Sequence, residues 1–201
     1  MKQGRLPWLK PEALSDEQRE LYERITGGPR GRGPRPFPLT DEEGRLHGPF
    51  NAMLFGPEVG TAVQELGAAI RYRSSLPDRA REIAILELAV RRGCAFEWYA
   101  HERVGRTAGL DDDEIRALLS GADCGSLDPL ETLVRRSVRT LLDERDLTGE
   151  LFAQAESVLG TTMLVELIAL VGYYDLLALS LQVWRTPLPP GATPPFTASS
   201  R

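Results

Sequence analysis

The sequence contains few of the side chains on which redox and metal chemistry depend. Its 201 residues include only two cysteines, Cys94 and Cys124, and two histidines, His47 and His101. Two cysteines are too few for a disulfide framework and are typical of a protein in a reducing compartment. Because metal-dependent families normally supply more histidines, we predict no metal site.

The sequence also has no excess of basic charge and no apolar secretory leader at its start. The formal net charge is -5 and 42% of the residues are hydrophobic, a balance typical of one globular domain and not of a phosphate-binding surface. The N-terminal residues MKQGRLPWLKPEAL contain no apolar core of a secretory signal. We therefore expect a cytoplasmic protein with no nucleic-acid partner.

The periodicity of apolar residues indicates helices along the chain, and no segment alternates as a strand does. Ser15 and Gln18 form a capping box, which predicts a helix over residues 16–25 that ends at Gly27. The 78–92 segment is apolar almost all round, so we expect its helix at the centre of the domain. Helices are predicted in the same way over residues 57–73, 78–92, 94–107, 111–119, 129–143, 148–159 and 161–184. The predicted fold class is all-α.

A segment rich in glycine, proline and arginine extends from residue 28 to residue 49 and is predicted to be a long irregular loop. No predicted strand precedes its glycines, so a solvated loop is favoured over a phosphate-binding loop. Arg30, Arg32 and Arg35 have no acidic residue among them and could attract an anionic substrate.

The helix predicted over residues 161–184 is apolar enough to raise the question of a membrane span. Glu166, Asp175 and Gln182 interrupt it, and charges within a span are costly in lipid. We therefore predict no membrane insertion and assign the helix to the core or to the subunit interface of a homo-oligomer. The Pro-rich tail, residues 186–201, is expected to be extended.

Three reactive side chains share one face of a predicted helix. Cys94, Glu97 and His101 are three and four residues apart, which places them in one stripe with Trp98 beside it. A carboxylate four residues before an imidazole can hydrogen-bond it and fix its tautomer, so the pair can pass a proton at neutral pH. Antiparallel packing of the preceding helix could bring Glu82 to the same stripe.

Other interpretations of this stripe stay open. A glutamate and a histidine four residues apart are commonly an exposed ion pair. Peroxide reduction needs a thiol with a low pKa and a resolving cysteine, and no second cysteine lies near Cys94 in the sequence. A metal site of Cys94, Glu97 and His101 is geometrically conceivable. Glu87 is as interior in the sequence as Glu82, so the spacing alone does not decide which glutamate joins the stripe.

Several segments of the chain resemble a known family. The matching residues are Glu82, the run CAFEWYAH from Cys94 to His101, and the tripeptide AGL at residues 108–110. These resemble the core of the carboxymuconolactone decarboxylase family, which shares the alkyl hydroperoxidase D-like fold. The upstream segment GRLHGPFNAMLFGPEVG is similar to that family too, so the resemblance covers residues 44–185. It implies an all-helical oligomer, trimeric or hexameric, without a cofactor.

The family resemblance implies two kinds of chemistry. Its peroxidase branch carries a C-x-x-C-x-x-x-H motif preceded by a glutamate, which Glu82, Cys94 and His101 match. Glu97 stands where the second cysteine is expected, and this substitution removes the attacking thiol. The decarboxylase branch is similar to this chain in carrying a glutamate and a histidine at these places.

The resemblance therefore implies a cofactor-independent decarboxylase-like lyase that acts on a small carboxylated lactone or unsaturated acid by acid–base proton transfer. The alternatives are a thiol peroxidase that uses Cys94 and a non-catalytic helical oligomer that binds a small molecule or a partner. The candidate catalytic residues are Glu97, His101, Glu82 and Cys94, and the candidate substrate-binding residues are His47, Asn51 and Trp98.

The sequence also predicts how the chain is divided. Residues 1–43 are expected to form an N-terminal helix and the Gly/Pro/Arg-rich loop. Residues 44–185 are expected to form the alkyl hydroperoxidase D-like helical domain, and residues 186–201 the Pro-rich tail.

Overall fold

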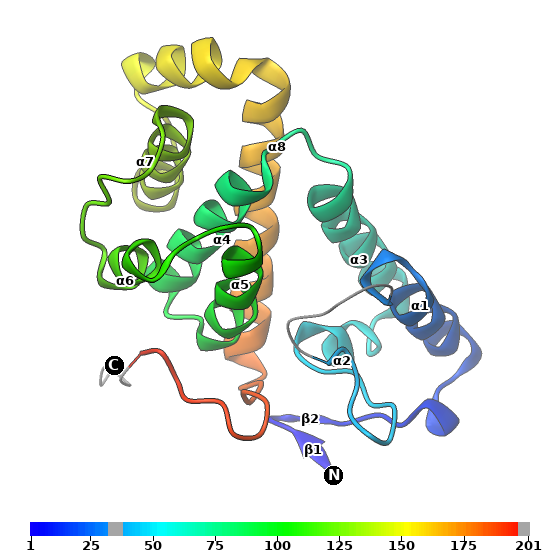
Figure 1. Ribbon diagram of the computed structural model, residues 1–201. Helices are drawn as coiled ribbons and strands as arrows, with labels where there is room; N and C mark the ends of the chain where they lie inside the picture. Colours follow the sequence, from blue (N-terminus) through cyan, green and yellow to red (C-terminus); the bar gives the residue numbers. More distant parts are fainter. Residues whose placement is uncertain (32–37, 197–201) are drawn as a thin grey trace. The chain divides into compact units, whose positions relative to one another are not determined.

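The computed structural model describes residues 1–31 and 38–196 of the chain (Figure 1). The chain divides into two compact units. Of the described residues, the first unit comprises residues 1–73 and 179–192, and the second comprises residues 74–178 and 193–196. The three-part division drawn from the sequence stays a prediction.

The first unit contains a small hairpin and three α-helices. Its elements are β1 (Lys2–Gln3), β2 (Leu6–Pro7), two 3-10 turns η1 (Pro11–Ala13) and η2 (Pro29–Gly31), α1 (Asp16–Gly27), α2 (Pro49–Met53) and α3 (Pro57–Tyr72). The capping box of Ser15 and Gln18 is present and begins α1, as predicted. The prediction of no strands was wrong, because β1 and β2 pair as antiparallel strands. Helix α2, which begins at the end of the loop predicted over residues 28–49, was not predicted.

The second unit is helical throughout its regular elements. It contains α4 (Asp78–Arg92), α5 (Ala95–Thr107), α6 (Asp112–Ser120), α7 (Pro129–Glu144) and most of α8 (Gly149–Val183). The eight α-helices of the described residues confirm the helical fold predicted from the apolar periodicity.

Helix α4 is the centre of the second unit, as its apolar sequence predicted. It packs against both α5 and α7 (Figure 1). Ile83, Leu86 and Ala89 of α4 join Trp98 of α5 and apolar residues of α6 in one buried cluster. Ten consecutive residues of α4 are buried, so polar side chains on this helix are buried as well.

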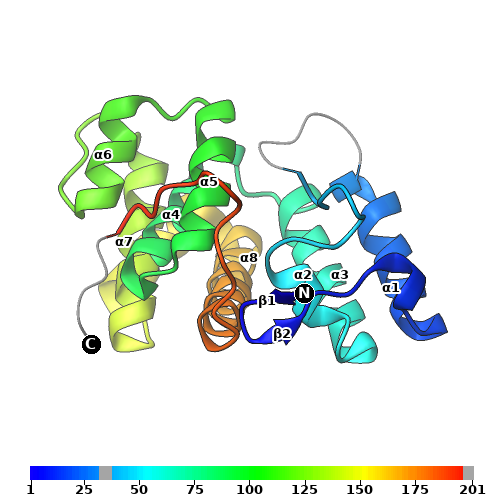
Figure 2. The same ribbon diagram turned by 90° about the horizontal axis from the view of Figure 1, so that it is seen from below.

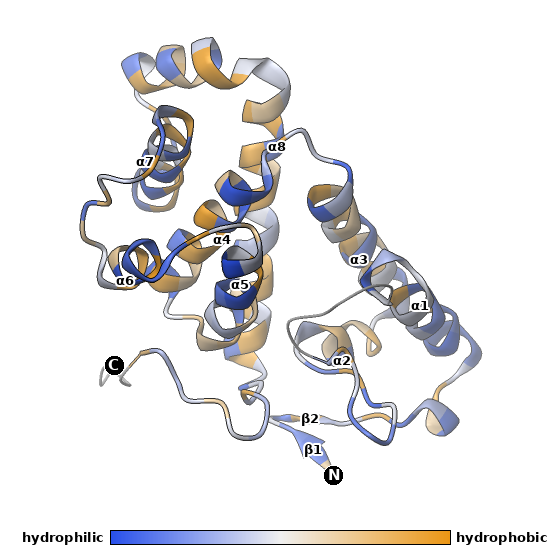
Figure 3. Ribbon diagram, in the orientation of Figure 1, coloured by the Kyte–Doolittle hydropathy of each residue, from blue (hydrophilic) through white to orange (hydrophobic). Residues whose placement is uncertain are grey.

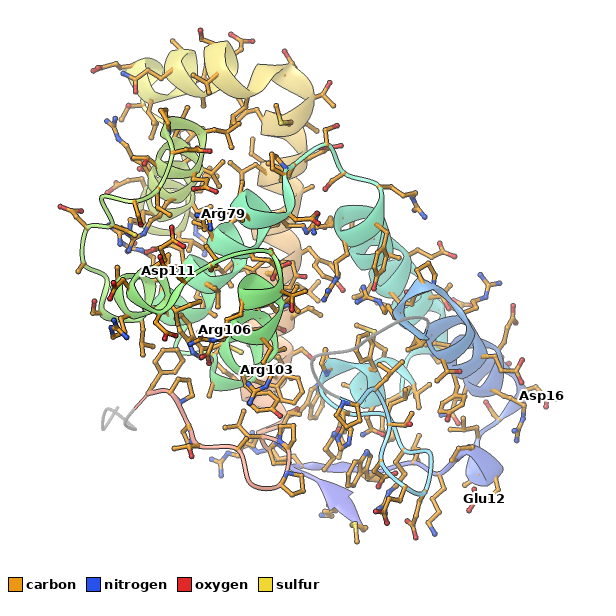
Figure 4. The ribbon with its side chains drawn as sticks, in the orientation of Figure 1. Glu12, Asp16, Arg79, Arg103, Arg106 and Asp111 are labelled. Carbon is orange, nitrogen blue, oxygen red and sulfur yellow. The ribbon has the colours of Figure 1, made fainter. Side chains whose placement is uncertain are left out.

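One arginine ties the start of α4 to the starts of two other helices. Arg79 donates from Nη2 to Glu114 at 2.8 Å and from Nε to Glu131 at 2.7 Å. Each glutamate is also the third residue of a capping box, which begins α6 at Asp111 and α7 at Asp128. Figure 4 labels Arg79 and Asp111 at this junction. The network fixes how α6 and α7 approach α4.

Helix α8 is broken at one glycine. Gly160 has φ 71 and ψ 165, a conformation that favours glycine, so two helices meet there at a kink. The sequence predicted this boundary between residues 159 and 161. Figure 3 shows hydrophobic residues along α8 beyond the kink.

Helix α8 is also long enough and apolar enough, by length and composition only, to cross a membrane. Half of its most apolar window is buried inside the structure, as in the core helices of soluble proteins. Other apolar side chains of the helix face outward, including Val165 with 61% and Ile168 with 47% of their surface exposed.

Residues 186–196, after α8, contain no helix or strand, and the last of them pack on the second unit, while the extended tail predicted over residues 186–201 stays a prediction. Phe196 lies edge-on to Trp98, with ring centroids 6.1 Å apart. Figure 2 shows this segment passing along α5. Phe196 covers the buried apolar cluster of the unit to which Trp98 belongs.

Candidate active site

The reversal between α4 and α5 brings together side chains from both helices. Gly93 adopts a left-handed conformation, with φ 60 and ψ 32, and caps α4. Cys94 then caps the start of α5. Because α5 runs back along α4, the predicted antiparallel pairing is confirmed, and the middle of α4 faces the middle of α5.

His101 lies between two carboxylates in this pairing. Its Nδ1 is 2.6 Å from Oε2 of Glu82 on α4, and its Nε2 is 3.4 Å from Oε2 of Glu97, one turn earlier on α5. The structure thus selects Glu82, and not Glu87, as the glutamate that joins the stripe.

All three side chains are withdrawn from water. Glu82 is 0% exposed, Glu97 3% and His101 4%. The exposed ion pair considered from the sequence is therefore wrong for Glu97 and His101. Electrostatic interactions and hydrogen bonds are stronger in such a low-dielectric setting than at a surface, so the two carboxylates strongly constrain the imidazole.

Two further residues hold this group, and sequence reasoning missed both. Nε of Arg81 lies 3.6 Å from Oε1 of Glu82, and Arg81 is itself anchored by Asp78 at 2.7 Å. Tyr174 of α8 lies edge-on to the His101 ring, with centroids 5.0 Å apart and planes at 89°. The signal for Arg81 was its place next to Glu82 in an otherwise apolar helix, whereas Tyr174 had none because it is distant in sequence.

Cys94 lies on the same edge of α5 and is buried. Burial, together with the negative charge of Glu97, raises the pKa of the Cys94 thiol to about 12, although the nearby backbone N–H groups of Glu97 and Phe96 act in the opposite direction. The thiol is therefore protonated at neutral pH.

Trp98 does not share this edge. It is 2% exposed and packs in the apolar cluster of the second unit with Ile83, Leu86 and Leu118. Its described surroundings are those of a core residue, and its role as a substrate contact stays a prediction.

His47 and Asn51 belong to the first unit, and each is engaged there. The His47 ring lies 5.3 Å from the Trp8 ring, and burial lowers the pKa of His47. The amide of Asn51 accepts from the backbone N–H of Leu9 and donates to the carbonyl of Pro7, which fixes the segment after β2. Their contacts with substrate also stay predictions.

The arginines of the predicted anion-attracting loop are partly beyond what the structure describes. Arg30 lies over the Phe50 ring, 5.2 Å from its centroid, while Arg32 and Arg35 are outside the described residues. Among the described residues, no group of three or more histidine, cysteine, aspartate and glutamate side chains is arranged to hold a metal ion.

The segment that carries this site matches a known family. Residues 57–138, which include Glu82, Cys94, Glu97 and His101, match the Carboxymuconolactone decarboxylase family. This match to the carboxymuconolactone decarboxylase family covers less than half of the chain, but it spans the whole stretch from α4 to α5 that carries the candidate site. The search of curated proteins found no sequence that matches this chain.

Solved structures share the alkyl hydroperoxidase D-like fold with this chain. An uncharacterised peroxidase-related protein from Ralstonia eutropha with an alkylhydroperoxidase AhpD core is 13% identical, with a TM-score of 0.73 and coverage of 94% of both chains. A protein of unknown function from Agrobacterium tumefaciens, with a proposed antioxidant defence role of the AhpD type, is 18% identical. Its TM-score is 0.63, and the match covers 69% of this chain and 96% of that one. At these identities the likeness concerns the fold alone.

Proposed function

We propose that this protein is a cofactor-independent lyase of the carboxymuconolactone decarboxylase type, which acts on a small carboxylated lactone or unsaturated acid. The observation that carries the proposal is the burial of His101 between Glu82 and Glu97. The match of residues 57–138 to the carboxymuconolactone decarboxylase family supports it. A histidine held on both sides by carboxylates has the requirements of a general acid–base catalyst.

The chemistry follows from the substrate class. When the bond to the departing carboxylate breaks, carbon dioxide leaves and the electron pair stays on carbon as an enolate conjugated with the lactone carbonyl. Nε2 of His101 or the Glu97 carboxyl then delivers a proton to that carbon, and the carbonyl reforms. Glu82 acts on the other ring nitrogen, where it orients the imidazole and stabilises its protonated form. Glu82 is thus a positioning residue, and Glu97 and His101 are the candidate proton donors.

Thiol peroxidase chemistry at Cys94 is the second candidate. The peroxidase-related protein that shares the fold favours it. The raised pKa of Cys94 disfavours it, because the thiolate is the nucleophile in peroxide reduction. Glu97 also occupies the position at which the resemblance predicts the second redox cysteine.

The remaining parts of the proposal concern the setting of the reaction. We propose a cytoplasmic homo-oligomer, trimeric or hexameric, whose ligand is a small carboxylate. The outward-facing apolar residues of α8 support an association between copies, because soluble monomers seldom expose a row of large apolar side chains. A non-catalytic oligomer that binds a small molecule is the remaining alternative.

A panel of small lactone acids tests the function. Carbon dioxide release is measured for the full chain and for Glu97→Gln, His101→Asn and Cys94→Ser. Glu102→Gln is the matched control, since Glu102 lies on the same helix but pairs with Arg106 at the surface. We expect the first two variants to lose on the order of a hundredfold or more in turnover, and Cys94→Ser and the control to keep it.

Three outcomes would contradict parts of this proposal. Full turnover by a folded Glu97→Gln variant removes Glu97 from the mechanism. Peroxide consumption that Cys94→Ser abolishes supports the thiol route instead. Absence of turnover with binding of a small carboxylate supports the non-catalytic alternative.

A further inference from the structure

A cavity of about 310 Å³ lies in the second unit, between α7 and the connection that precedes it. This volume is at the lower end of the range for small-molecule sites. Its walls include Asp123, Cys124 and Leu127 of the connection, and Arg135, Arg136 and Arg139 of α7. None of these residues belongs to the candidate active site.

The arginines of this cavity are held in place from behind. Glu87 of α4 accepts from Nε of Arg135 at 2.8 Å and from Nε of Arg139 at 2.8 Å. Their Nη2 groups donate to the carbonyls of Ala117 and Gly121. The hydrogen bonds described for the two side chains thus use Nε and Nη2, and the Nη1 group of each remains as a donor for a ligand.

The buried carboxylate behind the cavity is ionised. Burial raises the pKa of Glu87, but hydrogen bonds from Arg139 and Arg135 outweigh it and hold that pKa below its ordinary value. Glu87 is also shared with Arg91, whose other partner is Asp143. One carboxylate therefore fixes two guanidinium groups that face the cavity without neutralising both.

The charge of the walls favours an anion. Three arginines stand against one carboxylate, that of Asp123, which is exposed to solvent. A guanidinium matches the planar, two-oxygen edge of a carboxylate or phosphate. Leu127 and the backbone of Gly125 provide room for a short apolar part of the ligand.

We propose that this cavity is a second ligand site, which binds a small organic oxyanion, a carboxylate or a phosphate ester, through Arg136, Arg139 and Arg135. It is separate from the acid–base group. Glu87 follows Glu82 by five residues on α4, so the two side chains point about 140° apart around the helix axis. Glu82 faces α5, and Glu87 faces α7.

Cys124 makes the site measurable because its thiol is on the cavity wall and partly accessible, whereas Cys94 is buried. In a Cys94→Ser background Cys124 is the single thiol of the chain. Its sulfur attacks an aromatic disulfide, a mixed disulfide forms, an aryl thiolate leaves, and the thiol proton passes to solvent. A reagent with two carboxylates and a neutral dipyridyl disulfide are compared at constant ionic strength.

The arginines should accelerate the anionic reagent selectively. We expect the ratio of the two rates to fall about tenfold in the Arg136→Gln/Arg139→Gln variant. Arg116→Gln, which removes the same kind of charge from the exposed surface of α6, should leave the ratio unchanged. Thermal unfolding of each variant verifies the fold, and Arg136→Gln alone serves if the double variant does not fold, because Arg136 is exposed.

Competition between an anion and the labelling reagent identifies the class of ligand. Succinate and inorganic phosphate are each titrated against the reaction of Cys124 with the neutral reagent. Saturable protection by either anion in the parent, lost in the arginine variant, supports the proposal, and the more effective anion identifies the ligand class. Protection by neither anion, equal protection in the variant, or an unchanged rate ratio would overturn it. None of these readouts depends on turnover at Glu97 and His101.

Discussion

His101 and Glu82 are nineteen residues apart in sequence, yet Nδ1 of the imidazole lies 2.6 Å from the carboxylate. The contact depends on the reversal at Gly93, which turns α5 back along α4. A hydrogen bond at Nδ1 fixes the tautomer of the ring and so determines whether Nε2 carries a proton. Nε2 of His101 faces Glu97. Either the imidazole nitrogen or the Glu97 carboxyl can therefore present a proton on the same edge of α5.

The first prediction concerns Glu82 as a positioning residue. Glu82→Gln keeps an oxygen that can accept from Nδ1 but removes the negative charge that favours the imidazolium. We expect turnover of a lactone acid to fall roughly ten- to a hundredfold.

Urea denaturation separates this role from a structural one. A variant that merely folds less well unfolds at a lower urea concentration than the parent, whereas loss of positioning lowers kcat in a protein that stays folded. Glu102→Gln, on the exposed side of α5, is the control and should resemble the parent. A folded Glu82→Gln variant with an unchanged rate would contradict the role assigned to this residue.

The second prediction concerns the reactivity of the two cysteines. Since the pKa of Cys94 is raised to about 12, its thiol is protonated throughout the physiological range and should resist alkylation. We expect iodoacetamide to modify only Cys124 in the folded protein, and both residues after denaturation. Peptide mass spectrometry checks this, and rapid labelling of Cys94 at neutral pH would revive the peroxidase interpretation.

Much of the helical fold could be predicted from the sequence, because the signals are local. The capping box at Ser15 marks the start of α1. Glycines mark the end of α4 at Gly93 and the kink of α8 at Gly160. The hairpin of β1 and β2 was missed because strands of two residues are too short to alternate. Helix α2 was missed because its five residues are too few for a period.

The candidate site was predictable only where its residues share a helix. Cys94, Glu97 and His101 follow from helical spacing, whereas the choice of Glu82 over Glu87 needed the direction in which α4 packs. Tyr174 lies seventy-three residues beyond His101 in the sequence, and no local pattern connects them. Long-range packing, and not residue chemistry, limited the prediction.

The third prediction concerns association through α8. Val165 and Ile168 lie three residues apart and face outward, with 61% and 47% of their surfaces exposed. We expect a trimer or hexamer by light scattering, and a shift to smaller species in Val165→Glu/Ile168→Glu, because charges in an apolar contact are costly. Glu156→Gln, at an exposed position before the kink, is a control. A monomeric parent would contradict the prediction.

The fourth prediction concerns the junction of α4, α6 and α7. Arg79 binds Glu114 and Glu131, whose side chains are only 4% and 7% exposed. Arg79→Gln leaves both carboxylates buried without their cation. We expect the free energy of unfolding near neutral pH to fall by about 3 kcal/mol. Urea denaturation measures the change, and Arg116→Gln, which breaks an exposed ion pair with Asp113, should cost less than about 0.5 kcal/mol.

The pH dependence of the same variant tests the cause. Hydrogen bonds from Arg79 outweigh burial and hold the pKa of Glu114 below its ordinary value of 4.5. A depressed pKa stabilises the folded state above the unfolded value, and that contribution is lost as the pH falls through the folded value. The difference between parent and Arg79→Gln should therefore shrink as the pH drops below about 4.5. A difference that stays constant with pH would mean that Arg79 acts through packing and not through its charge.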